Sequence, residues 1–181
     1  SVEMKYLGCV FIIVSFSAHS QRNQKSISNI TMEDIVLSLE VHNDAREDVG
    51  TPPLKWSIEL ADDAQKYAEV LASINGRLIH SYSGDDQGEN LYKVFSKRGV
   101  LEDAPTFPGR DASKRWFDEI KFYRYAKIRR FRLGPAIGHY TQMIWESTTH
   151  VGIGWAVSAT GAVFVVARYS PAGNYIGERP Y

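Results

Sequence analysis

Residues 138–149 read GHYTQMIWESTT and combine core residues with polar side chains that packing alone does not require. If this segment is a helix, His139 and Met143 lie on one face at positions i and i+4, with Gln142 beside them. Gly138 has no side chain, so another part of the backbone can come close to the imidazole. The stretch therefore predicts a histidine at the edge of an apolar surface. A single histidine of this kind usually has only a structural role, with its ring hydrogen-bonded to a backbone carbonyl. A functional role for His139 therefore has to be supported by other motifs of the chain.

Three further strings occur along the chain, namely HNDAR at 42–46, GENL at 88–91 and FVVARYSPAGN at 164–174. Together with GHYTQMIWESTT, and in this order, they resemble the signatures of the CAP superfamily, which comprises the cysteine-rich secretory, antigen-five and pathogenesis-related-one proteins. The resemblance spans roughly residues 31–175. It implies a three-layer α-β-α sandwich with a central antiparallel sheet. Activity has to be argued from the site, because one fold carries many functions.

The length and charge of the chain limit its class. A chain of 181 residues is typical of one domain. Lysine plus arginine and aspartate plus glutamate both total 21, so no overall positive charge attracts nucleic acid. We therefore expect a single CAP domain over residues 31–181 that does not bind nucleic acid.

Residues 1–20 have the pattern of a secretory signal peptide. A Met-Lys pair at 4–5 precedes an apolar run over 6–16, which is shorter than the roughly 20 residues that span a bilayer. Ala18 and Ser20 are small residues suited to cleavage before Gln21. Residues 1–3 are then a cloning scar or part of an upstream start, and residues 21–30 form a short N-terminal extension. The alternative is a buried N-terminal apolar segment.

The single cysteine, Cys9, lies inside this leader, so the mature chain would have no disulfide. Secreted CAP proteins usually carry several disulfides, and in this respect the chain resembles the cysteine-poor, Golgi-associated branch of the family. We expect an extracellular protein, with a Golgi or membrane-associated protein as the alternative.

The secondary-structure pattern predicts an α+β domain. Apolar residues recur at helical spacing over 31–48, from Ser57 to about Asn75, and from Asp111 through Tyr123, and Thr31, Ser57 and Asp111 are suitable helix caps. Strands are predicted over 89–95, 151–157 and 162–169, with a turn at 158–161. Proline and glycine residues between 96 and 110 indicate a surface loop. Helices around an antiparallel sheet give a layered domain.

Two polar residues on these helices need partners. His42 continues the apolar stripe of the first helix, and we expect it to make structural hydrogen bonds. Glu119 lies beside the apolar stripe of the third helix. Because an unpaired buried charge costs several kcal/mol, we expect Glu119 to be partly exposed or to have a cationic or hydrogen-bonded partner.

Four side chains match the cavity tetrad of the CAP family, namely His80, Glu89, Glu119 and His139. The resemblance implies that the two imidazoles approach one another, with both carboxylates alongside. Imidazoles suit Zn²⁺, and the carboxylates would favour Mg²⁺ or Ca²⁺. Two imidazole ligands leave positions open for water, so we expect weak and poorly selective binding of a divalent metal. In the alternative arrangement, the carboxylates do not bind the metal but hydrogen-bond to the imidazoles and orient them.

Sequence motifs of common hydrolases are absent. The chain has neither HExxH nor GxSxG, and the mature chain lacks a cysteine nucleophile. Ser81 follows His80, but adjacency in sequence does not place the imidazole on the hydroxyl. We therefore expect binding rather than catalysis and assign no catalytic residue. A metal-dependent hydrolase, using a metal-bound water or a glutamate as base, is one alternative.

Residues 122–132 read FYRYAKIRRFR and interleave aromatic with basic residues. The corresponding loop is aromatic in the family, so the resemblance implies sterol contacts at Tyr123, Tyr125 and Phe131. It also implies a fatty-acid groove between the helix at 31–48 and the helix that begins near His139. The predicted ligand is a sterol or a fatty acid. An effector or venom-allergen-like protein that acts through protein–protein contacts is the other alternative.

The basic residues of this loop go beyond what the resemblance implies. Five of them lie within nine residues of a chain with zero net charge: Arg124, Lys127, Arg129, Arg130 and Arg132. Near an acidic bilayer, each basic residue is worth about 1 kcal/mol before screening. An anionic membrane surface is therefore a candidate partner, and a solvated charged loop is the alternative. A homodimer is also compatible with the sequence.

Overall fold

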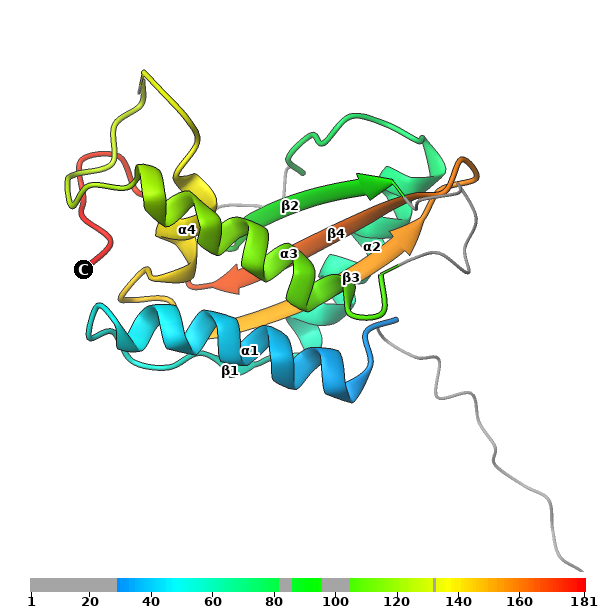
Figure 1. Ribbon diagram of the computed structural model, residues 1–181, viewed down its shortest axis with the longest axis horizontal. Coiled ribbons are helices and arrows are strands. Elements are labelled where there is room, and N and C mark those ends of the chain that lie inside the picture. Colours follow the sequence, from blue (N-terminus) through cyan, green and yellow to red (C-terminus); the bar gives the residue numbers. More distant parts are fainter. Residues whose placement is uncertain (1–28, 82–85, 96–104, 132) are drawn as a thin grey trace, which may run out of the picture.

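The computed structural model describes residues 29–81, 86–95, 105–131 and 133–181 (Figure 1). The predicted leader, most of the N-terminal extension and Arg132 lie outside the described residues. The elements follow one another as α1 (Met32–Glu47), β1 (Lys55–Trp56), α2 (Ile58–Ser73), β2 (Gly88–Phe95), α3 (Pro108–Phe117), the 3-10 helix η2 (Asp118–Phe122), α4 (Gly138–Met143), β3 (His150–Val157) and β4 (Ala162–Ser170). No helix in the described part of the chain is long and apolar enough to cross a membrane.

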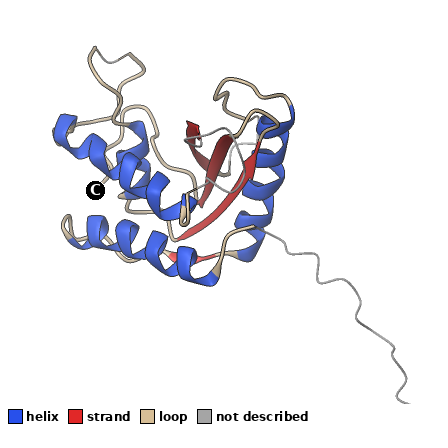
Figure 2. Cartoon of the chain, turned by 45° about the vertical axis from the view of Figure 1, so that its right-hand side comes forward, coloured by secondary structure: helices blue, strands red, loops and turns tan. Residues whose placement is uncertain are grey.

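The sheet has the strand order β1-β3-β4-β2 and lies between two helical layers (Figure 2). Side chains from α1, α3 and α4 pack on one face, and α2 covers the other. This is the predicted α-β-α sandwich. The three long strands are antiparallel as expected, but β1 pairs with β3 in parallel, so the sheet is mixed. A two-residue strand has no alternation that sequence reasoning could recognise.

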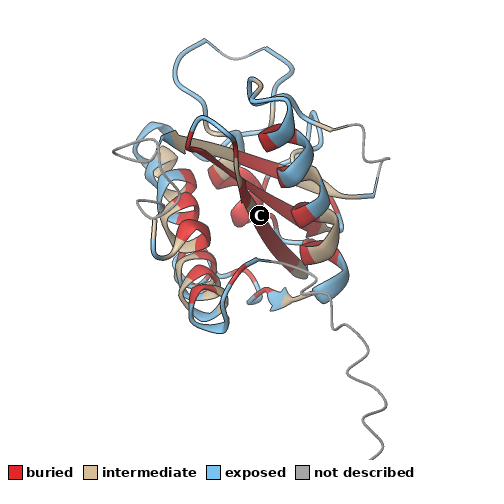
Figure 3. Ribbon diagram, turned by 90° about the vertical axis from the view of Figure 1, so that its right-hand side faces the viewer, coloured by how far each residue is buried: buried red, intermediate tan, exposed pale blue. Residues whose placement is uncertain are grey.

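The central strand β4 is buried on both faces (Figure 3). Val163 and Val165 face the α1–α3 layer, whereas Phe164 and Val166 face α2. Its neighbour β3 carries bulky residues on one face and glycine on the other. A Cβ at Gly152 would lie 2.1 Å from the backbone nitrogen of Ala61. Helix α2 therefore packs directly on the backbone of β3, as the bare face of that strand predicts.

Local capping explains two helix starts. The side-chain oxygen of Thr31 accepts the backbone N–H of Asp34, and that of Ser57 accepts the N–H of Leu60. Both caps confirm the sequence prediction.

The start of α3 corrects the sequence prediction. This helix begins at Pro108, not at Asp111, so the last residues of the predicted 96–110 loop are helical. Proline suits the first helical position because its missing N–H would be unsatisfied there. The next two N–H groups, of Gly109 and Arg110, donate to Asp34 of α1 at 2.9 and 2.8 Å. The cap thus comes from 75 residues away, where no local pattern could reveal it. The helix then tightens into η2 at Asp118.

The fully buried Arg46 joins the end of α1 to the segment that follows α4. Its Nη1 donates to the carbonyl oxygens of Met143 (3.0 Å) and Trp145 (2.8 Å). Its Nη2 donates to the carbonyl of Thr148 (3.0 Å), and its Nε donates to that of Pro52. Burial lowers the pKa of Arg46 to about 10, so the guanidinium is still charged at neutral pH. One side chain therefore satisfies several carbonyls that no regular element pairs.

His42 lies one turn before Arg46 and is also fully buried. Its Nδ1 donates to the carbonyl of Ser38, and its Nε2 accepts from the hydroxyl of Tyr169, both at 2.8 Å. Burial holds the pKa of His42 at about 4, so the ring is neutral near pH 7. The expected structural role of His42 is confirmed.

Candidate functional site

His139 and Glu119 form one pair at the start of α4. Nδ1 of His139 donates to Oε1 of Glu119 at 2.7 Å. The other carboxylate oxygen accepts the backbone N–H groups of His139 (2.9 Å) and Tyr140 (3.2 Å). Glu119 thus satisfies two N–H groups of the first turn of α4 that have no partner inside the helix. The expectation that Glu119 would have a hydrogen-bonded partner is confirmed.

The imidazole of His139 is held in a fixed orientation. The indole of Trp116 stacks on it, with ring centroids 6.2 Å apart and an interplanar angle of 26°. The side-chain amide of Asn90 donates to the backbone carbonyl of His139 at 3.1 Å. Within the described residues, Nε2 of His139 has no hydrogen-bond partner, so this nitrogen is available as a metal ligand.

His80 and Glu89 form a second pair at the start of β2. Nδ1 of His80 donates to Oε1 of Glu89 at 2.7 Å. The backbone N–H of Ser81 donates to the same oxygen, and its hydroxyl donates to Oε2. Arg168 completes the group. Its Nη2 donates to the Ser81 hydroxyl at 2.7 Å, and its Nη1 lies 3.0 Å from Oε2 as an ion pair without hydrogen-bond geometry.

These contacts set the charge of the pair. The hydrogen bond to Glu89 raises the pKa of His80 above its usual value, and burial opposes this only partly. Burial alone would raise the pKa of Glu89, but the bonds from His80 and Ser81 and the charge of Arg168 lower it below its usual value. The charged pair thus persists over a wider pH range than two isolated groups would allow.

The two His–Glu pairs lie beside consecutive residues of β2. In the β2–β4 ladder, Glu89 is opposite Arg168, and Asn90 is opposite Ala167. Successive side chains of a strand point to opposite faces. Glu89 therefore lies on the α2 side, where Arg168 also stacks over Tyr67 of α2 at 5.4 Å. Asn90, which contacts His139, lies on the other side.

The donor types suit a divalent ion, because each glutamate orients one imidazole and leaves its Nε2 available. No group of three or more His, Cys, Asp or Glu side chains among the described residues is placed to hold a metal ion. One ion shared by His80 and His139 stays a prediction.

The three aromatic residues assigned to sterol contact lie in different environments. Tyr123 is 8% exposed and packs edge-on against Tyr140 in the core. Tyr125 packs on Tyr181, and its hydroxyl donates to the Tyr181 carbonyl. Phe131 is 86% exposed. Tyr123 thus anchors the loop, while Phe131 and one side of Tyr125 face solvent. Sterol contact at these residues stays a prediction.

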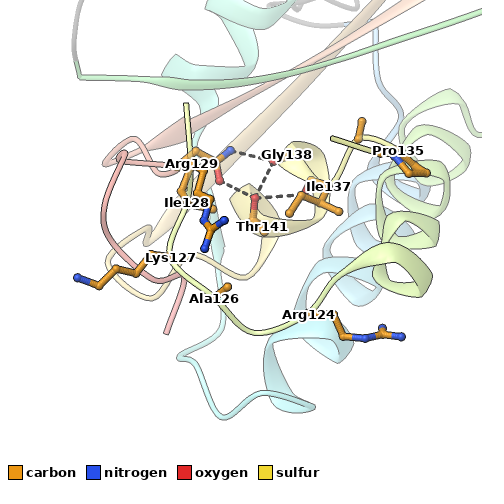
Figure 4. A pocket seen from close by; sticks show the side chains of 12 residues that line it. Arg124, Ala126, Lys127, Ile128, Arg129, Pro135, Ile137, Gly138 and Thr141 are labelled. Carbon is orange, nitrogen blue, oxygen red and sulfur yellow. Dashed lines mark hydrogen bonds between the residues drawn. The ribbon is translucent and has the colours of Figure 1, made fainter. Parts of the chain in front are cut away.

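A pocket of about 430 Å³ lies between the loop after η2 and the first turn of α4 (Figure 4). It is lined by Arg124, Ala126, Lys127, Ile128, Arg129, Gly134, Pro135, Ala136, Ile137, Gly138, Thr141 and Asn174. None of these lining residues comes from α1, so this pocket differs from the groove that the family resemblance implies. Its size is within the range of small-molecule sites.

The polar groups of the pocket wall are already paired. The hydroxyl of Thr141 donates to Oδ1 of Asn174 at 2.6 Å, and Nδ2 of Asn174 donates to the Gly138 carbonyl at 2.8 Å. Among the described residues, no ion pair joins Arg124, Lys127 or Arg129 to a carboxylate. The pocket therefore offers an apolar wall and unpaired positive charges.

Sequence reasoning missed several residues of these sites. Arg168 and Asn174 both lie in the FVVARYSPAGN string, but nothing in that string showed which histidine or helix they would contact. The pocket residues Pro135, Ala136 and Ile137 lie just before the signature stretch, where the sequence shows no periodicity.

A sandwich of this topology with paired imidazoles and glutamates defines a CAP-type domain. The model of the cysteine-rich secretory protein family, CAP, matches residues 39–169. Pathogenesis-related leaf protein 4 of Solanum lycopersicum is 37% identical over 175 residues, covering 97% of this chain and 94% of that protein. The human Golgi-associated plant pathogenesis-related protein 1 is 39% identical over 142 residues, covering 77% and 84%. The chain belongs to the CAP family.

A solved structure agrees at the level of the fold. NaASP2, crystallised with Zn²⁺, superposes with a TM-score of 0.68 at 24% identity, covering 84% of this chain and 86% of that one. This confirms the predicted CAP fold.

The His80–Glu89 pair predicts a specific pH response. In wild type, the His80 ring should titrate above pH 6.5, because Glu89 stabilises the imidazolium. The favourable interaction is present below the ordinary histidine pKa and is lost as the pH rises through the raised value. In Glu89→Gln, the His80 pKa should fall, and His42 should titrate near 4 in both proteins. NMR of the histidine rings between pH 4 and 9 measures this; an unchanged His80 pKa in the variant would contradict the pairing.

Proposed function

We propose that this CAP protein binds a long-chain fatty acid in the pocket between the loop after η2 and α4. The observation that carries the proposal is an apolar pocket of about 430 Å³ beside three cations that have no carboxylate partner in the described part of the chain. Such a pocket complements a molecule with an apolar tail and an anionic head. A sterol, which has the tail but lacks the charge, is the competing ligand.

Apolar burial of the tail and hydrogen bonding of the carboxylate both support a fatty acid as the ligand. Burying each methylene of the tail against Ile128, Pro135 and Ile137 contributes about 0.8 kcal/mol. A carboxylate at the rim can form charge-assisted hydrogen bonds, which are about twice as strong as neutral ones. Arg129 suits this role because its planar guanidinium matches a carboxylate.

The contacts of Ser81 support binding over hydrolysis. Its hydroxyl donates to Glu89 and accepts from Arg168, so its proton is directed toward a carboxylate and not toward an imidazole. A serine nucleophile needs a base at hydrogen-bond distance from its proton, commonly a histidine. The neighbouring His80 uses Nδ1 for the same carboxylate.

Fatty-acid binding is tested by titrating labelled palmitate, its methyl ester and cholesterol. Palmitate should bind at micromolar protein, and the ester about ten-fold or more weakly, because a hydrogen bond to a charged group contributes about 1.5–3 kcal/mol. Ala136→Trp should fill the pocket and abolish palmitate binding. Ala159→Trp, in the exposed β3–β4 turn, is the matched control.

Each other outcome of this titration has a definite meaning. Cholesterol binding without palmitate binding would show that the ligand is a sterol and not a fatty acid. Equal loss in Ala136→Trp and Ala159→Trp would place the ligand elsewhere. Binding of neither lipid would reject the lipid function and leave the effector-like, protein-binding alternative.

A divalent ion is a second proposal for the same domain. His80 and His139 would supply Nε2 ligands, with Glu89 and Glu119 orienting the rings, and the ion would act as a Lewis acid or hold water. The NaASP2 structure with Zn²⁺ supports this for a protein of the same fold. Calorimetric titration with Zn²⁺ is the test. A shared ion predicts that His80→Ala and His139→Ala each abolish binding, whereas binding that survives both single variants contradicts a shared site.

We also propose that the protein is secreted. The signal-peptide pattern of residues 1–20 and the membership of the cysteine-rich secretory protein family support this. N-terminal sequencing of protein recovered from the culture medium should find Gln21 first; retention of the whole chain in cells would contradict it.

A further inference from the structure

The loop over residues 124–131 and 133–137, here called the projecting loop, extends beyond the helices on the side of the domain where the C-terminus lies (Figure 1). It carries Phe131 and Leu133, which are 86% and 100% exposed. Exposed apolar side chains that gather in one patch commonly mark a contact with another surface. Ile176, in the neighbouring C-terminal segment, is 60% exposed.

Basic side chains lie on the same loop as these apolar residues. Arg124, Lys127, Arg129 and Arg130 are exposed on the loop, and no ion pair in the described part of the chain joins any of them to a carboxylate. Figure 4 shows Lys127 and Arg124 extending outward from the loop, away from Thr141. Arg179 of the C-terminal segment adds a further cation, 5.4 Å over the ring of Tyr125. The result is a local positive field on a chain with zero net charge.

The C-terminal segment holds the projecting loop in place. The N–H of Gly177 donates to the carbonyl of Ile128 at 2.9 Å, and the N–H of Ile128 donates to the carbonyl of Glu178 at 2.7 Å. The hydroxyl of Tyr125 donates to the carbonyl of Tyr181 at 2.6 Å. These bonds order the loop before any partner binds, which reduces the entropy lost on binding.

From these three observations we infer that the projecting loop and residues 175–181 form a docking surface for an anionic lipid bilayer. Phe131 and Leu133 enter the interfacial region of the bilayer, and the cations lie among its acidic head groups. Apolar side chains combined with several basic residues are the two signals that stable peripheral binding requires. Neither signal alone distinguishes a bilayer from a protein, but exposed cations without carboxylate partners in the described residues, on the same loop as the fully exposed Leu133, favour the bilayer.

This inference is independent of the fatty-acid pocket. Phe131, Leu133, Arg130 and Arg179 do not line that pocket. Variants at these four positions should therefore lose bilayer binding and keep palmitate binding, so either proposal can fail without the other.

The test is co-sedimentation of the protein with phosphatidylcholine vesicles that contain about one third phosphatidylserine. Wild type should bind at 0.1 M salt and lose most binding at 1 M, because the Debye length falls from about 10 Å to about 3 Å. The Arg130→Ser, Arg179→Ser double variant should bind roughly thirty-fold more weakly, since each basic residue near an acidic surface contributes about a five-fold factor. The Phe131→Ser, Leu133→Ser double variant should bind at least about ten-fold more weakly.

Matched control variants change exposed residues of helices α3 and α1. The Lys114→Ser, Arg115→Ser variant removes two exposed cations from α3, and Met32→Ser removes an exposed apolar residue from α1. Both should bind like wild type. Equal binding to pure phosphatidylcholine vesicles, no binding of wild type at low salt, or equal losses in the control variants would each overturn the docking surface.

Discussion

The hydrogen bonds of the buried Arg46 guanidinium are the constraint on which the functional end of this domain depends. The segment from the end of α4 to the start of β3 has no regular hydrogen-bond ladder, although Ile144, Trp145 and Thr148 within it are buried. Arg46 supplies donors to the carbonyls of Met143, Trp145 and Thr148 at 2.8–3.0 Å. A charged side chain can be buried at tolerable cost when its donors are satisfied, and here backbone carbonyls satisfy them.

Helix α4 is held at both ends by residues from other elements. Glu119 of η2 accepts the first N–H groups, of His139 and Tyr140, and Arg46 of α1 binds the carbonyl of Met143 at the last turn. A helix of six residues has little stability of its own, so these contacts fix its position. Both functional features use α4: its first residues present His139, and Thr141 forms part of the pocket wall. A shift of α4 would alter the His139–Glu119 pair and the pocket together.

The sequence predicted what depends on local pattern or on family signature. Thr31 and Ser57 are recognisable as caps because the donors are three residues away. The hydrogen-bonded roles of His42 and Glu119 follow from their positions as polar groups on or beside apolar stripes. Contacts between distant residues were not predictable. The Asp34 cap of α3 crosses 75 residues, and the Arg46 acceptors are backbone atoms that carry no residue signature. The resemblance assigns Tyr123 to sterol contact, which stays a prediction, and no local pattern shows that its ring also packs on Tyr140.

Amide hydrogen exchange in Arg46→Met tests most directly whether Arg46 holds α4 in place, because methionine is an unbranched apolar side chain without any hydrogen-bond donor. We predict that the amides of Ile144, Trp145 and Thr148 exchange about ten-fold faster or more relative to those of α2, because each buried carbonyl that loses its donor costs about 1–3 kcal/mol and 1.4 kcal/mol is ten-fold. Arg115→Met, at an exposed arginine of α3, should leave both regions unchanged. Exchange in Arg46→Met that matches wild type at these amides, or that rises equally in α2, would contradict the claim that Arg46 holds α4 in place.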